Sequence, residues 1–137
     1  MVSYLVDTNV ISELRKGSRC DQSVAAWWAT VAEGEIFLSV LTIGEIRKGI
    51  ESIRRRDTPS AIVLETWLAG VVADHGDRIL PIDLNVTQEW GRLNVPDPLP
   101  VIDGLIAATA KVRGLTLVTR NVPDFARTGV STLNPWS

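Results

Sequence analysis

The sequence predicts a single α/β domain over residues 1–137, built around a mainly parallel central sheet. Two observations predict this fold class. Apolar runs of strand length recur at residues 4–6, 36–40 and 115–119, and continuous apolar runs are typical of parallel strands that are buried on both faces. Segments with apolar residues at helical spacing lie between these runs. Strands that alternate with helices are typical of α/β folds.

The expected elements before residue 60 are, in order, a strand at 4–6, a helix at 10–14, a helix at 24–31, a strand at 36–40 and a helix that starts after residue 42. Gly34 is expected to close the second of these helices. Thr42 is the expected N-cap of the third helix. Glu45 follows three residues later, which is the spacing of a capping box, so we expect Glu45 in the first turn of that helix.

The later elements are, in order, a helix that ends near residue 76, a strand at 78–82, a helix capped by Asp83, a proline-rich loop at 94–100, a helix at 101–113, a strand at 115–119 and a short strand near 130–133. Pro81 lacks an N–H donor and is expected at a sheet edge or strand end. Gly76 stops the helix that carries His75. Asp103 falls in the first turn of the helix that starts at Val101.

Composition excludes several classes of site. Cys20 is the only cysteine and His75 the only histidine, so neither a disulfide within the chain nor a cysteine-rich or histidine-rich metal site can form. Any chemistry is therefore expected from carboxylates. The formal net charge of −2 provides no bulk attraction to nucleic acid. No apolar run approaches the roughly 20 residues of a membrane span, and we expect a cytoplasmic location.

Acidic and amide side chains follow several of the predicted strands. Asp7 comes directly after the first strand, Glu45 follows the second, and Asn121 and Asp124 follow the strand at 115–119. In open α/β sheets, ligands bind outside the carboxyl ends of the strands. Two carboxylates about 5 Å apart repel by roughly 3 kcal/mol, so several of them together require either a cation or strongly raised pKa values, and composition and periodicity do not decide between the two. If a cation is present, oxygen ligands select a hard one such as Mg²⁺ or Mn²⁺. Each residue taken alone is better explained as a helix cap.

Five segments together resemble one protein family. They are, in chain order, Leu5–Glu13 (LVDTNVISE), Ser39–Gly49 (SVLTIGEIRKG), Val101–Lys111 (VIDGLIAATAK), Thr119–Phe125 (TRNVPDF) and Asn134–Trp136 (NPW). The chain thus resembles the PIN-domain ribonucleases, and within them the FitB-like branch of the VapC toxins. The resemblance implies a three-layer α/β/α PIN-like domain with the activity of an endoribonuclease that depends on Mg²⁺ or Mn²⁺. It also implies an RNA substrate, a VapB-type antitoxin that blocks the site, and either a homodimer or a hetero-oligomer with that antitoxin.

The same resemblance implies a role for each residue of its motifs. Asp7 and Asp103 would be the principal metal ligands, and Glu45 would bind the metal directly or through water. Thr8 and Asn9 would support the site by hydrogen bonds. At the fourth corner some relatives carry Asp where this chain has the neutral Asn121. Three alternatives follow: Asp124 supplies the missing charge, so that it counts among the catalytic residues; Asn121 holds a water; or a second metal binds weakly or only with substrate.

Two arginines are candidates to contact substrate phosphate. Arg120 lies next to the expected site, where a structural ion pair explains it equally well. Arg47 opens a basic stretch that is otherwise explained as a solvated helix face. Two rival functions also remain at this point. The first is a catalytically silent PIN-fold module that acts by protein binding, favoured by Asn121. The second is a phosphotransfer domain with Asp7 as nucleophile, although Asn9 occupies the position where such enzymes commonly have a second acid.

Overall fold

The structure, a computed structural model, describes residues 2–137. Its strands are β1 (Tyr4–Val6), β2 (Ile36–Ser39), β3 (Ile79–Leu80), β4 (Thr116–Val118) and β5 (Thr132–Leu133). Its α-helices are α1 (Thr8–Leu14), α2 (Gln22–Ala29), α3 (Val40–Arg54), α4 (Thr58–His75), α5 (Leu84–Leu93) and α6 (Val101–Arg113). Short 3-10 turns are η1 (Gly17–Arg19), η2 (Glu33–Glu35), η3 (Gly76–Arg78) and η4 (Val122–Thr128).

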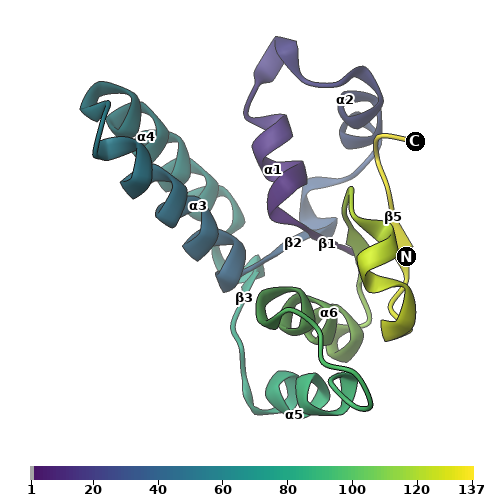
Figure 1. The fold of residues 1–137 in the computed structure, drawn as a ribbon. Helices are drawn as coiled ribbons and strands as arrows, with labels where there is room; N and C mark the ends of the chain where they lie inside the picture. Colours follow the sequence, from purple (N-terminus) through teal and green to yellow (C-terminus); the bar gives the residue numbers. More distant parts are fainter. Residues whose placement is uncertain (1) are drawn as a thin grey trace.

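Within these residues the strands form one sheet in the order β3-β2-β1-β4-β5, and every pairing is parallel. The predicted parallel sheet is therefore confirmed, and β3, which precedes Pro81, lies at an edge as expected. The chain adds β2 and β3 on one side of β1, whereas β4 and β5 lie on the other side (Figure 1). Strand order thus reverses between β1 and β4, which is where ligands bind in open α/β sheets.

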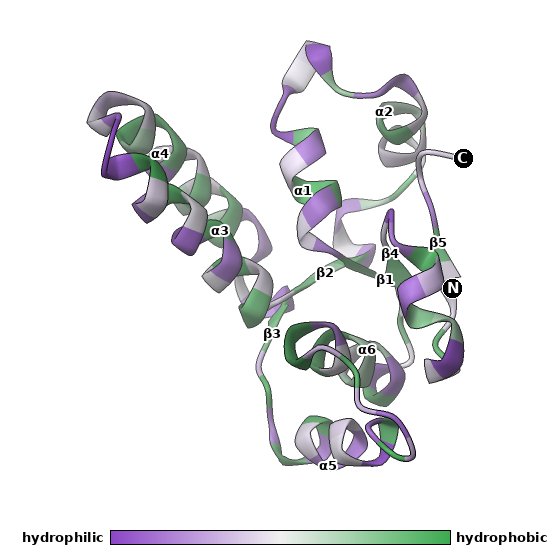
Figure 2. Ribbon diagram, viewed as in Figure 1, coloured by the Kyte–Doolittle hydropathy of each residue, from purple (hydrophilic) through white to green (hydrophobic). Residues whose placement is uncertain are grey.

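Two apolar cores flank the sheet and confirm the three-layer α/β/α arrangement. Successive residues of a strand point to opposite faces, and accordingly Val6 belongs to one core and Leu5 to the other. The first core joins the sheet to α1, α2, α3 and α4, and the second joins it to α5, α6 and η4. Figure 1 shows α1 and α2 above the sheet and α5 and α6 below it, while the α3–α4 hairpin extends to one side. Figure 2 shows hydrophobic residues on β1, β2 and β4, between these helices.

The start of α3 differs from the sequence prediction. The N-cap is Ser39, whose hydroxyl accepts a hydrogen bond from the N–H of Leu41 at 3.0 Å, so the expected Thr42 cap and its capping box with Glu45 are wrong. Strand β2 runs directly into α3 without an intervening loop. Thr42 is consequently buried inside the helix, and Glu45 lies in its second turn instead of its first.

Other local predictions can be checked in the same way. Helix α2 ends at Ala29, before the expected stop at Gly34, and Thr30 is its C-cap. Asp83 caps α5, as predicted, by accepting from the N–H of Val86 at 3.0 Å. His75 is the last residue of α4, and its Nδ1 lies 2.8 Å from the carbonyl oxygen four residues earlier. No helix in residues 2–137 is both long enough and apolar enough to cross a bilayer.

Candidate active site

Asp7 lies at the carboxyl end of β1, at the reversal of strand order. Its N–H donates to the carbonyl of Val118 at the end of β4, at 2.9 Å. Its Oδ1 accepts from the N–H of Thr8 at 2.8 Å, so Asp7 is the N-cap of α1. Its Oδ2 accepts from the hydroxyl of Thr119 at 2.9 Å. The capping interpretation is thus correct for one oxygen of Asp7, while the other oxygen joins a side-chain network at the strand ends.

Thr119 was not predicted as a site residue, although it is the centre of that network. Its side chain is fully buried. Besides donating to Asp7, its hydroxyl oxygen accepts from the N–H of Asn121 at 3.1 Å and lies 3.5 Å from Nδ2 of Asn9. The available signal was positional, since Thr119 follows β4 just as Asp7 follows β1. The hydroxyl therefore links the two strand ends that form the floor of the site.

Glu45 reaches the same edge of the sheet from α3. Its Oε1 accepts from the hydroxyl of Thr8 at 2.6 Å, and the hydroxyls of Thr8 and Thr42 lie 3.4 Å apart. Thr8 therefore connects the carboxylate of Glu45 to the cap of α1, and its predicted supporting position is observed. Glu45 itself is exposed, in contrast to Asp7, which is 8% exposed.

Asp103 faces the site from the first turn of α6. Burial raises the pKa of the Asp103 carboxyl above its ordinary 3.8, and the negative charges of Asp124 and Glu45 raise it further. Burial likewise raises the pKa of Asp7, although hydrogen bonds from Thr119 and Thr8 oppose it, and the charges of Glu45 and Asp103 add to the increase. The charge of Glu45 thus acts on both Asp7 and Asp103, the charge of Asp103 acts on Asp7, and the charge of Asp124 acts on Asp103.

Asn121 and Asp124 occupy the turn after β4. Asn121 precedes η4 and is exposed, and its carbonyl accepts from the N–H of Asp124 at 3.0 Å. Its N–H is tied to Thr119, as described above, which fixes the backbone at this corner. Asp124 is also exposed and acts electrostatically on Asp103. Asp124 therefore supplies negative charge that acts on Asp103, whereas Asn121, at the start of the same turn, supplies none.

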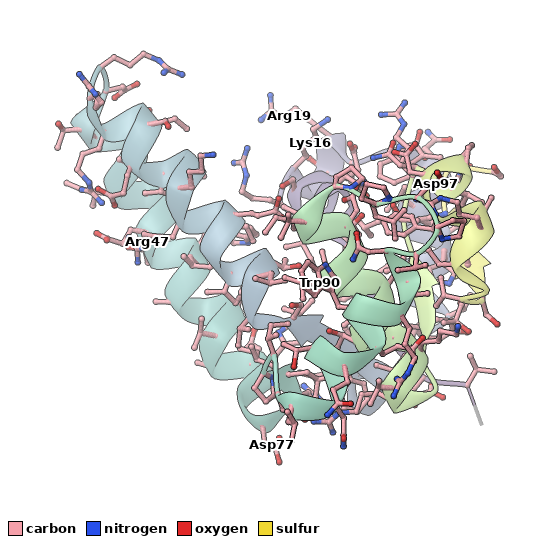
Figure 3. All side chains as sticks on the ribbon, turned by 60° about the horizontal axis from the view of Figure 1, so that its bottom comes forward. Lys16, Arg19, Arg47, Asp77, Trp90 and Asp97 are labelled. Carbon is pink, nitrogen blue, oxygen red and sulfur yellow. The ribbon has the colours of Figure 1, made fainter. Side chains whose placement is uncertain are left out.

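The two arginines that were predicted to bind phosphate have different surroundings. Arg47 forms ion pairs with Glu51 on α3 and Glu65 on α4, and it lies on the α3–α4 hairpin, away from the other helices (Figure 3). Arg120 donates its N–H to Oδ1 of Asn9 at 3.3 Å, beside the site. The structure therefore brings Arg120, but not Arg47, to the strand ends that carry the carboxylates.

An open pocket of about 510 Å³ adjoins Glu45. It is bounded by α3 and by Ile102, the residue before Asp103. Two glycines of α3, Gly44 and Gly49, line it without side chains, and Lys48 is its cation. The pocket therefore provides open space beside the carboxylate of Glu45.

The donor set fits a hard divalent cation. In the part of the chain that the structure describes, no three acidic, histidine or cysteine side chains are close enough to hold a metal ion by themselves. Mg²⁺ characteristically uses one or two carboxylates and completes its shell with water and substrate phosphate. Asp7 and Asp103 are each repelled by neighbouring carboxylates. A divalent cation bound by their oxygens would offset this repulsion.

Comparisons with known proteins agree with this architecture. The family model for the PIN domain matches residues 4–130. The chain is 32% identical over 141 residues to VapC ribonuclease Y4jK of Sinorhizobium fredii, with 96% of each chain covered. It is 30% identical to the toxin FitB of Neisseria gonorrhoeae, covering 96% of this chain and 97% of that protein. The crystal structure of FitAcB from Neisseria gonorrhoeae has a TM-score of 0.89 at 31% identity, covering 97% and 98% of the two chains.

Proposed function

This chain belongs to the PIN-domain family, and from that premise we propose that it is a toxin that cuts RNA internally with the help of Mg²⁺ or Mn²⁺. The observation that carries the proposal is the convergence of Asp7, Glu45 and Asp103 at the carboxyl edge of the sheet. It occurs in a chain that matches a VapC ribonuclease over nearly its whole length.

Each acidic residue has a distinct part in this proposal. Asp7 and Asp103 are the principal ligands for the cation, and Asp7 is kept in one orientation by the Thr119 hydroxyl and the Thr8 N–H. Glu45, oriented by the Thr8 hydroxyl, binds the ion directly or through water. The cation, when bound, supplies Lewis-acid activation of water and charge neutralisation for hydrolysis at phosphorus. Asp124 adds the negative charge that Asn121 does not.

Cleavage of RNA by the purified chain tests this proposal. We expect cleavage with Mg²⁺ or Mn²⁺ and none with a chelator. Asp7→Asn should lose more than about 100-fold, because changing an outer-shell partner of a metal ligand already costs about 10–100-fold. Asp77→Asn, which removes an exposed carboxylate of η3, is the matched control and should cut like the wild type. Equal cleavage in all samples would identify a contaminating nuclease and refute the mechanism.

A VapB-type antitoxin is the proposed partner, since the chain is similar to a protein that is named a toxin. We expect expression of the wild type, but not of Asp7→Asn, to arrest growth, and co-expression of the antitoxin to relieve it. Light scattering on the purified chain, alone and with the antitoxin, distinguishes a homodimer from a hetero-oligomer. The silent-module alternative makes the opposite prediction: tight antitoxin binding with no cleavage of RNA by the wild type at any metal concentration.

A further inference from the structure

Arg120 and Trp136 form a stacked pair at the edge of the site. The guanidinium carbon of Arg120 lies 4.9 Å from the centre of the Trp136 ring. Arg120 is exposed, and it directly follows Thr119, whose hydroxyl holds Asp7. Trp136 is thereby in contact with the residue that directly follows Thr119, the threonine that holds Asp7.

The fold holds both members of this pair. The N–H of Thr119 donates to the carbonyl of Leu133, at the end of β5, at 3.0 Å, which ties the tail to β4. The N–H of Trp136 donates to Oδ1 of Asn134 at 2.9 Å, and the indole packs against the first apolar core. At the other end, the backbone of Arg120 is bonded to Asn9, as described above. The position of the indole is therefore set by tertiary structure, and the arginine side chain lies against it.

The cation–π contact leaves the hydrogen-bond donors of the guanidinium available. The contact with the Trp136 ring takes up none of its N–H groups, which lie in the plane of the guanidinium as a fork of donors. Among residues 2–137, Arg120 has no ion pair, in contrast to Arg47 and Arg54, whose guanidinium groups are bound by Glu51 and Glu65. Arg120 therefore keeps its full charge and its donors for an external ligand.

Glu13 is the carboxylate that could have formed an ion pair with Arg120. It instead accepts from the N–H of Asp21 at 2.9 Å and from Nζ of Lys16 at 2.9 Å. The hydrogen bond from Asp21 is the main cause of the lowered pKa of Glu13, followed by the hydrogen bond from Lys16, and the charge of Arg120 contributes least. The structural ion pair that was one explanation of Arg120 is thus replaced by the contact with Trp136.

We propose that Trp136 is a positioning residue, which holds Arg120 so that its guanidinium edge binds an RNA phosphate next to the one that is cut. This inference rests on the proposed function. The surrounding carboxylates repel a phosphate backbone, so a substrate strand needs a cation at the rim of the site. A planar fork of donors matches the oxygens of a phosphate and carries no information about bases. The contact is therefore independent of RNA sequence.

Binding of labelled single-stranded RNA tests the inference without cleavage. Fluorescence anisotropy is measured on oligo(U) and oligo(A) over a range of salt concentrations, with Asp7→Asn as the parent protein. We expect Arg120→Ala to weaken binding of both RNAs by about tenfold or more, and to reduce the slope of log affinity against log salt by about 0.7. Trp136→Leu should weaken binding by about two- to fivefold, the usual strength of an exposed cation–π pair, with Trp136→Phe in between.

The decisive comparison is between Trp136→Leu in the parent and in the Arg120→Ala background. If the indole acts through the arginine, Trp136→Leu has no further effect once Arg120 is alanine, because the two changes remove one interaction. An equal loss in both backgrounds would overturn the proposal. If Trp136→Leu does not fold, Trp136→Phe is compared in the same two backgrounds.

Matched controls separate the pair from general effects. Arg56→Ala removes an exposed arginine that follows α3, and Trp28→Leu removes a tryptophan that packs on the same core as Trp136; both should bind RNA like the parent. Unchanged RNA binding of Arg120→Ala, with weaker antitoxin binding, would overturn the proposal and assign the charge to a protein partner. Failure of the wild type to cleave RNA, with the salt result intact, would refute the proposed nuclease activity but keep the phosphate contact.

Discussion

Replacing Thr119 by valine removes one hydroxyl from the floor of the site while nearly preserving the shape of the side chain. Three contacts are lost together: the hydrogen bond donated to Oδ2 of Asp7 at 2.9 Å, the one accepted from Asn121 at 3.1 Å, and the 3.5 Å contact with Asn9. Thr119 is fully buried, so water cannot take the place of its hydroxyl. We therefore expect this single change to affect both the stability and the activity of the protein.

The loss of stability can be worked out from these contacts. A hydrogen bond to a charged group contributes about 1.5–3 kcal/mol, and a buried donor left without its acceptor costs about 1–3 kcal/mol. The N–H of Asn121 is only partly buried and can recover some of its bonding from water. A total of about 2–4 kcal/mol follows, or a melting temperature lower by roughly 7–14 °C for a chain of this size.

The effect of Thr119→Val should depend on pH. The bond from Thr119 lowers the pKa of Asp7 and so favours the ionised form. Without this bond, the pKa of Asp7 in the folded state lies still further above 3.8, which destabilises the folded protein only when Asp7 is ionised. The stability difference from the wild type is thus fully present above the raised pKa of Asp7, and it shrinks as the pH falls through that pKa toward 3.8.

Chemical unfolding followed by circular dichroism, in a chelator, measures this difference. Thr116→Val is the matched control, because Thr116 lies on β4, the strand that Thr119 directly follows, and is only half-buried. Its stability change should stay within about 0.5 kcal/mol. Thr119→Ser keeps the hydroxyl and should retain RNA cleavage even if it loses some packing. A loss below about 0.5 kcal/mol for Thr119→Val, or an equal loss for Thr116→Val, would refute the role assigned to the hydroxyl.

Three further predictions concern the carboxylates and the packing beneath them. Burial raises the pKa of Asp7, so protonated Asp7 stabilises the folded state at low pH, and this stability is lost as the pH rises above 3.8 through the raised pKa. In a chelator at pH 7, Asp7→Asn should therefore unfold at a higher urea concentration than the wild type. The difference between the two proteins should be smaller at pH 4. Mg²⁺ should raise the melting temperature of the wild type but not that of Asp103→Asn. At a Mg²⁺ concentration of 100 times the dissociation constant, the expected stabilisation of the wild type is about 2.7 kcal/mol. Equal shifts in both proteins would argue against a metal site at α6. A Cβ on Gly104 would lie 3.0 Å from Cδ1 of Trp90. Gly104→Ala should therefore lower the free energy of unfolding in urea by about 1–3 kcal/mol. Gly70 on α4 has open space around it, so Gly70→Ala is the control and should raise the free energy of unfolding by up to about 1 kcal/mol.

Local sequence patterns located most elements and most of the acidic residues. The apolar runs at 4–6 and 115–119 contain β1 and β4, which lie side by side, and the residues at their ends follow from that assignment. Asp103 was placed correctly because the start of α6 is marked by the preceding prolines. The start of α3 was misplaced because a capping box is a local pattern that can also occur inside a helix. Ser39, three residues earlier, caps α3 instead.

The roles of the two arginines needed tertiary contacts that no local pattern contains. Arg47 and Glu65 are brought together only when α3 packs against α4, and this packing turns the expected phosphate ligand into part of a surface ion-pair network. Arg120 and Trp136 are brought together only when β5 pairs with β4. In each case the partner is distant in the chain, so spacing along the sequence could not reveal it.

By itself the sequence determined the fold class and the set of acidic side chains at one edge of the sheet. Hydrophobic periodicity specifies strands and helices, and parallel strands carry their following residues to a common edge. Only the tertiary structure decided how those side chains are held: Asp7 by Thr119, Glu45 by Thr8, and Asp124 beside Asp103. The physical reason is that hydrogen bonds and charge repulsion act over a few ångströms, and the packing of the helices on the sheet sets those distances.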